Sequence, residues 1–177
     1  MDGNGQTKNG SGSLVQLVHD GVDESVPNGV IVEDPHGAQG HLLVTGAQAE
    51  ECAQVLADKF ASSSFIRVGF EDVAALLGDG IGRYGRGSAS GENLAVQAGD
   101  RALGTVLHGT DPETVCGVII DITASDDMSL SEVIRAVGHI QSAVALNASC
   151  IFGLDLDSSY GDQMQVDVIC VGGQSDF

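Results

Sequence analysis

Apolar residues recur every three or four positions in four stretches of the chain, a spacing typical of amphipathic helices. The clearest stripe lies in residues 47–60. Ser90 is the predicted N-cap of a later helix, and Ser129 with Glu132 three residues on forms a capping box at the start of the last one. Gly78 and Gly80 close the second helix. The predicted helices cover residues 47–60, 71–80, 90–107 and 129–144.

Short β-branched or continuously apolar runs bounded by Gly, Pro, Asn and Asp predict strands between these helices. Residues 14–26 give a weaker strand-and-turn pattern. The first two clear strands are close enough to form a hairpin, and so are the last two. The order predicts an α+β two-layer sandwich: a mixed sheet with helices packed mainly on one face. The clear strands are expected at residues 30–32, 41–45, 64–70, 115–123, 149–157 and 164–173.

The glycines of residues 78–93 include the pattern GxGxxG at Gly80, Gly82 and Gly85. A dinucleotide-binding turn needs a strand before this pattern and a helix beginning in it. Here a predicted helix comes before the glycines, and the next helix begins only near Ser90. We therefore expect the glycines to end a helix and to give a strand that is either flexible or closely approached by another element, with no phosphate bound.

The charge balance changes the picture of possible partners. The 177 residues include 25 acidic and 7 basic side chains, a net charge of −18. Such a surface repels nucleic acids and anionic membranes, so neither is an expected partner. Two origins remain open for the acidity, namely adaptation to high salt and an ordinary acidic protein. The chain shows no signal peptide and no apolar run long enough to span a membrane, which predicts a cytoplasmic location.

Side chains with metal-binding or catalytic potential give no convincing pattern. The cysteines lack metal-ligand spacing, and three of them lie in or beside apolar runs, so they are expected to be buried. The histidines also lack ligand spacing, and His139 is expected to be exposed or partly buried. Two groups of aspartates are interpreted as solvated loops, although carboxylate groups can bind cations. We expect no metal and no cofactor. The three cysteines in or beside apolar runs are Cys116, Cys150 and Cys170. The first group of aspartates is Asp121, Asp126 and Asp127, and the second is Asp155, Asp157 and Asp162.

Three collinear segments carry a resemblance to a known family. They are "GIGRYGRGSASGENLAV" (80–96), "GVIIDITASDDMSLSEV" (117–133) and "ASCIFGLDLDSSYGDQMQVDVICVGG" (148–173). They resemble the C-terminal domain of FtsZ, the cell-division GTPase related to tubulin. The resemblance implies a mixed sheet of four strands or slightly more over residues 64–177. Residues 1–13 are expected to be a flexible tail and residues 14–63 an N-terminal extension that matches poorly and either extends the sheet or covers a face.

The resemblance also carries expectations about chemistry. The family binds GTP through a "GGGTGTG"-type loop in another domain, and this sequence has no such loop, so we expect no enzyme activity from this chain. The family's "NVDFADV" synergy loop is similar to "RVGFEDV", residues 67–73. Phe70 and Asp72 match it, whereas Arg67 and Gly69 replace an asparagine and an aspartate. These four residues form the expected interaction site.

Three functions follow as alternatives. The favoured one is a non-enzymatic protein that binds an FtsZ-type subunit or itself and regulates or caps filaments in cell division. A homo-oligomeric scaffold or small-ligand binder that reuses the fold is the second. A metal-dependent enzyme at the aspartate loops is the third. The synergy-loop-like segment either docks on a partner or contacts nothing, and the sequence leaves this open.

Overall fold

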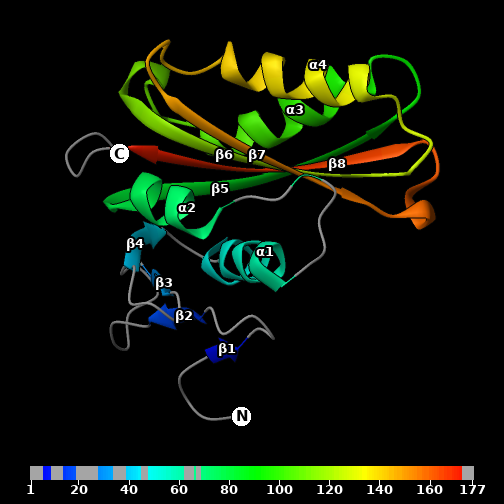
Figure 1. Cartoon of the computed structure of the whole chain (residues 1–177). Coiled ribbons are helices and arrows are strands. Elements are labelled where there is room, and N and C mark those ends of the chain that lie inside the picture. Colours follow the sequence, from blue (N-terminus) through cyan, green and yellow to red (C-terminus); the bar gives the residue numbers. More distant parts are fainter. Residues whose placement is uncertain are drawn as a thin grey trace.

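The computed structural model describes residues 6–8, 14–18, 28–33, 39–44, 48–61, 66 and 69–172. Within these residues the chain forms one mixed sheet in the order β1-β2-β3-β4-β5-β8-β6-β7 (Figure 1). The strands are β1 (Gln6–Lys8), β2 (Leu14–Val18), β3 (Asn28–Glu33), β4 (Gln39–Val44), β5 (Asp79–Ser90), β6 (Val115–Ala124), β7 (Ser149–Leu156) and β8 (Gln163–Gly172). The helices of four residues or more are α1 (Ala49–Ala61), α2 (Phe70–Leu77), α3 (Leu94–Val106) and α4 (Leu130–Gln141).

The N-terminal strands extend the sheet. β1 to β4 pair antiparallel in sequence order, and the predicted hairpin of β3 and β4 is confirmed. β4 then pairs parallel with the start of β5, from His41 opposite Asp79 to Val44 opposite Gly82. The two connecting helices, α1 and α2, make this parallel crossover possible. Part of the predicted tail, residues 6–8, is β1, and the rest of residues 1–13 lies outside the described residues.

The predicted hairpin between the last two strands is wrong. β8 lies between β5 and β6 and is antiparallel to both, whereas β7 pairs parallel with β6 at the edge of the sheet. Burial explains the arrangement. Every residue of β8 from Val166 to Gly172 is buried, which requires neighbours on both edges and cover on both faces. β7 is only partly buried and is suited to an edge, which it reaches through the α4 crossover.

Helices cover both faces of the sheet (Figure 1). α3 and α4 pack on one face against Ile120 and Val168, and α1 and α2 pack on the other against Ile119 and Ile169. The expected α+β fold with a mixed sheet is confirmed, but the described residues form eight strands where four or slightly more were expected, and the helices lie on both faces rather than mainly on one. Consecutive residues of β6 and β8 are apolar, so both faces of these strands had to be covered.

The glycines of β5 allow α3 to approach the strand. A Cβ atom at Gly87 would overlap the carbonyl oxygen of Ala98, and one at Gly85 would overlap that of Ala102. This is the close approach, one of the two alternatives that the sequence left open. No helix begins at these glycines, since β5 continues to Ser90.

Of the two predicted N-cap residues, one is confirmed and the other is wrong. Ser129 caps α4, and its hydroxyl oxygen accepts a hydrogen bond from the Glu132 amide, as predicted. Ser90 is not an N-cap, because it is the last residue of β5 and pairs with Gln163. α3 begins at Leu94 after Asn93, which has a left-handed φ of 56° and makes no side-chain cap. The β5 pairing therefore decides where the helix starts.

The strand predicted over residues 64–70 is not formed at its end, because Phe70 begins α2. Ile66 makes an isolated antiparallel bridge with Leu154 of β7. The other residues of this prediction, except Gly69, lie outside the described residues. Gly78, with a φ of 49°, ends α2 as expected.

Candidate interaction site and a buried charge network

The synergy-loop-like residues gather at the N-terminus of α2. Gly69 is the N-cap residue, Phe70 begins the helix and packs against the core, and Asp72 is exposed in the first turn. A Cβ atom at Gly69 would lie 2.6 Å from the Asp72 Oδ2 atom. Glycine therefore leaves room for this carboxylate close to the helix N-terminus, which favours negative charge. Arg67, the fourth expected residue, lies outside the described residues.

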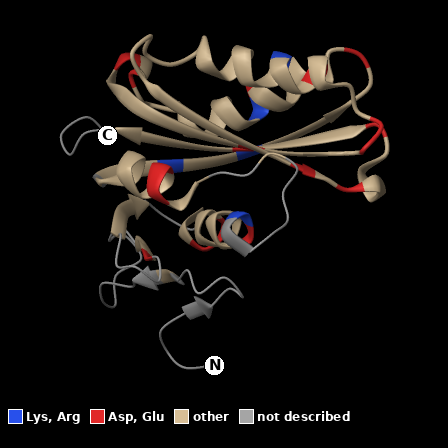
Figure 2. Ribbon diagram, in the orientation of Figure 1, with Lys and Arg blue, Asp and Glu red and all other residues tan. Residues whose placement is uncertain are grey.

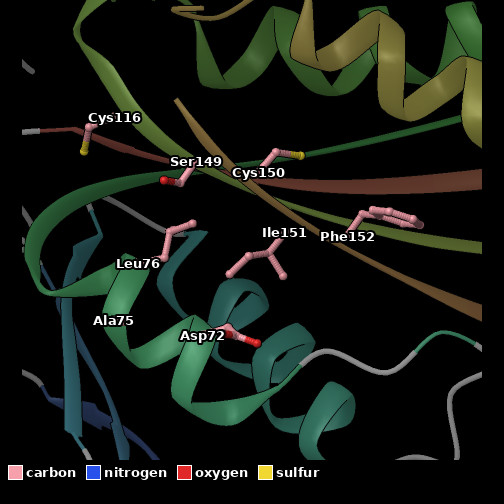
Figure 3. Close-up of a pocket in the computed structure, with 8 residues that line it drawn as sticks. All are labelled: Asp72, Ala75, Leu76, Cys116, Ser149, Cys150, Ile151 and Phe152. Carbon is pink, nitrogen blue, oxygen red and sulfur yellow. The ribbon is translucent and has the colours of Figure 1, made fainter. Parts of the chain in front are cut away.

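Asp72 also borders a pocket of about 730 Å³ between α2 and β7. Figure 3 shows the side chains of Asp72, Leu76 and Ile151 between the helix and the strand. The pocket is open, and its lining combines apolar side chains with the carboxylate of the exposed Asp72. The residues that line it are Asp72, Ala75, Leu76, Cys116, Ser149, Cys150, Ile151 and Phe152.

The cysteines only partly follow the prediction that they are buried. Cys170 is buried, Cys150 is half-buried and Cys116 is exposed, where its thiol donates a hydrogen bond to the Val171 carbonyl oxygen at 3.2 Å. A register shift at the start of β6 accompanies this exposure. Burial raises the pKa of both Cys52 and Cys170 to about 12, so these two thiols stay protonated near neutral pH.

A network of charged side chains that the sequence did not predict lies between α1 and the sheet. Lys59, near the end of α1, forms ion pairs with Asp121 of β6 and Asp155 of β7. The side chains of Lys59 and Asp121 are only 6% and 9% exposed. The interpretation of both aspartate groups as solvated loops is therefore wrong for Asp121 and for Asp155, which lies within β7 and pairs with Lys59. The signal was an aspartate inside the apolar run "VIIDIT", which needs a buried partner.

Asp167 of β8 forms the second half of this network. It accepts hydrogen bonds from the Tyr84 hydroxyl and from Gln165, and it pairs with the Arg86 Nε atom at 2.6 Å. Asp121 lies directly opposite Asp167 in the sheet register, and Asp167 lies opposite Arg86. Three adjacent strands therefore place charged residues side by side.

Burial sets the protonation behaviour of this network. The pKa of Asp121 is raised to about 6, mainly by burial; the Lys59 ammonium opposes the shift, and the carboxylates of Asp155 and Asp167 add to it. Burial, together with the hydrogen bond to Asp167, also raises the pKa of Tyr84. The ion pairs of Lys59 with Asp121 and Asp155 hold α1 to the sheet.

The remaining candidates are His139 and four aspartates. His139 is partly exposed, and its Nε2 atom lies 2.7 Å from an Asp100 carboxylate oxygen. The other aspartates of the two groups, Asp126, Asp127, Asp157 and Asp162, are exposed, in agreement with solvated loops. Over the described ranges no three His, Cys, Asp or Glu side chains converge as metal ligands. No described helix is long and apolar enough to span a membrane.

Comparison with known proteins decides the family. The family model for the FtsZ family, C-terminal domain, matches residues 80–174, more than half of the chain. The chain belongs to the FtsZ family. This confirms the resemblance, since the three collinear segments lie in the matched region.

Individual FtsZ relatives match over a longer stretch. The cell division protein FtsZ of Buchnera aphidicola subsp. Schizaphis graminum is 28% identical over 162 residues, which is 90% of this chain and 41% of that protein. The FtsZ of Mycoplasmopsis pulmonis is 34% identical over 120 residues, 67% of this chain and 31% of that protein. The chain thus spans less than half the length of these FtsZ relatives.

Solved structures agree with this family. An empty FtsZ dimer from M. jannaschii is 25% identical, with a TM-score of 0.61, and covers 72% of this chain and 39% of that chain. A mutant form of M. jannaschii FtsZ is 26% identical, with a TM-score of 0.63, and covers 72% and 40%. A TubZ-Bt filament subunit shares the fold at 12% identity and a TM-score of 0.56, covering 72% and 34%.

Proposed function

We propose that this FtsZ-family protein acts in cell division, in the cytoplasm, as a non-enzymatic regulator that binds the end of an FtsZ-type filament and caps it. The exposed Asp72 at the N-terminus of α2, in a family-type C-terminal fold, carries the proposal. Its position resembles the family's synergy loop, which docks on a neighbouring subunit. The partner is an FtsZ-type subunit rather than a nucleic acid or a membrane.

The loop composition supports docking without activation of the partner. The family motif supplies two carboxylates, and here Gly69 leaves only that of Asp72. Arg67 introduces a cation in the same segment, and a guanidinium attracts phosphate oxygens. We expect this face to dock on a nucleotide-bearing end while failing to complete the hydrolytic site. The chain itself binds no cofactor and hydrolyses no GTP in this proposal.

Sedimentation of FtsZ polymers tests the proposal. The full-length FtsZ-type protein of the same cell is polymerised with GTP in the presence of increasing amounts of this chain. Capping predicts shorter polymers, with the chain in the pellet. If polymer mass, polymer length and GTPase rate all stay unchanged, the proposal is wrong.

A matched pair of charge reversals localises the contact. Asp72→Lys removes the carboxylate at the α2 N-terminus and should abolish the effect on polymers. Glu92→Lys makes the same change of charge at an exposed residue just after the far end of β5 and should leave the effect intact. Equal effects of both variants would show that net charge, and not this surface, governs binding.

Self-association is the second candidate, because one similar M. jannaschii FtsZ structure is a dimer. In that case the same surface joins copies of this chain. Light scattering of the purified chain distinguishes the two candidates. A stable oligomer that does not bind FtsZ polymers favours the scaffold.

A further inference from the structure

β7 is the last strand at one edge of the sheet and borders the pocket beside α2. Within the described part of the chain, the strand that pairs with β7 is β6, on its inner side. Edge strands usually carry charges or proline that prevent another strand from pairing. Residues 149–154 of β7, "SCIFGL", contain neither. Residues 149–154 therefore carry no such protection where β7 borders the 730 Å³ pocket.

The chain itself shows that this edge accepts an antiparallel strand. The Ile66 amide donates to the Leu154 carbonyl oxygen at 3.1 Å, and the Leu154 amide donates to the Ile66 carbonyl oxygen at 3.2 Å. Backbone groups alternate in direction along a strand, so Phe152 and Cys150 present their N–H and C=O groups to the same edge as Leu154. Among the described residues, none forms a backbone hydrogen bond with these groups.

We propose that an extended, cationic segment of a partner protein adds to β7 as an antiparallel strand and fills the pocket between α2 and β7. Every second side chain of such a strand would enter the pocket against Leu76 and Ile151 and should be apolar. The side chains between them would point away from the pocket.

Charge complementarity determines the class of occupant. Asp72 is the charged residue that lines the pocket, and the exposed Glu71 precedes it on α2. Figure 2 shows acidic residues in red on α2, and the residues lining the pocket include no lysine or arginine. A chain of net charge −18 also attracts cations at long range. A peptide with basic and apolar residues in alternation complements both the Asp72 carboxylate and the apolar side chains that line the pocket.

A synthetic peptide tests the proposal directly. The probe is a fluorescent heptapeptide of alternating lysine and valine, and its partner is a heptapeptide of alternating glutamate and valine. Fluorescence anisotropy with the complete chain should show saturable binding of the lysine peptide only. Equal binding of both peptides would overturn the proposal.

Two substitutions at one edge residue separate strand addition from general attraction. Cys150→Pro removes the outward amide, and an edge strand tolerates proline. Cys150→Val removes the same thiol and keeps the amide. We expect binding about tenfold weaker for Cys150→Pro and unchanged for Cys150→Val. Equal affinities of these two variants would refute backbone pairing.

A measurement on the unmodified chain covers the case in which the proline variant does not fold. Addition of the lysine peptide should slow amide hydrogen exchange at Cys150 and Phe152, and unchanged exchange at both would refute the pairing. Asp72→Asn should weaken binding, with Glu92→Gln as the control. No FtsZ-type protein is present, so a negative result here leaves filament capping untouched, and a failure of capping leaves this test valid.

Discussion

Lys59 is the residue that fixes the position of α1 on the sheet. Its side chain is 6% exposed and pairs with Asp121 and Asp155 on two neighbouring strands. Taking charges out of water costs several kcal/mol for each ion, and only close pairing offsets that cost. The network therefore makes the position of α1 on the sheet specific, since a shifted helix would leave buried charges unpaired.

Removal of the Lys59 cation should be strongly destabilising. Lys59→Met keeps most of the side-chain volume but leaves Asp121 beside Asp155 without a counter-charge. We expect the free energy of unfolding to fall by about 3–5 kcal/mol, measured by urea denaturation. The double variant Lys59→Met with Asp121→Asn should recover part of the loss. A loss below about 1 kcal/mol for Lys59→Met would show that water reaches the network.

Asp121 should make stability depend on pH in a particular direction. Its pKa is about 6 in the folded chain, against 3.8 as the ordinary value. Because the folded-state pKa is the higher one, its stabilising contribution is present at low pH and is lost as the pH rises through about 6. Relative to Asp121→Asn, the unmodified chain should lose about 2–3 kcal/mol between pH 4 and 7.5. Urea midpoints at each pH measure this, and parallel curves for the two proteins would contradict it.

At the scale of elements, two glycines of β5 and α3 have different environments, and only one of them lies at the contact between the strand and the helix. Gly87 lies under the backbone of α3, whereas Gly104 of α3 faces open space. The same substitution should therefore have opposite effects at the two positions. Close packing, rather than a need for glycine dihedral angles, explains the glycines of β5 at this contact.

An alanine pair tests this explanation. Gly87→Ala should destabilise the chain by about 1–3 kcal/mol, because the added methyl group pushes α3 off the strand. Gly104→Ala should be neutral or stabilising by up to about 1 kcal/mol, because alanine favours a helix interior. Thermal denaturation of both variants provides the comparison. Stabilisation by Gly87→Ala would disprove the close contact.

At the scale of the whole molecule, the N-terminal elements and the family-type unit share one sheet and the hydrophobic cluster on one of its faces. Buried residues of β2 to β4 and of α1 join Tyr84, Ile119 and Ile169 in a single cluster. The described residues of the 14–63 extension thus both extend the sheet and cover one of its faces, where the sequence left these as alternatives.

A truncated chain tests the dependence of the two parts on each other. A chain of residues 64–177 alone would expose Ile119, Ile169 and Val171 and would leave Asp121 without Lys59. We expect it to aggregate or to bind hydrophobic dyes, whereas the complete chain does not. Sedimentation and dye fluorescence measure both properties. A monomeric, dye-negative fragment would show that residues 64–177 fold on their own.

The amino-acid sequence by itself determined the family and most local structure. Collinear motifs identified the FtsZ C-terminal fold, the stripe of residues 47–60 gave α1, and Ser129 gave the start of α4, because these signals depend on near neighbours in the chain. The tertiary structure alone decided the place of β8 in the sheet, the start of α3 at Leu94 and the pairing of Lys59 with Asp121. These features join residues far apart in sequence, and their energy comes from burial on both faces of one sheet, which no local pattern records.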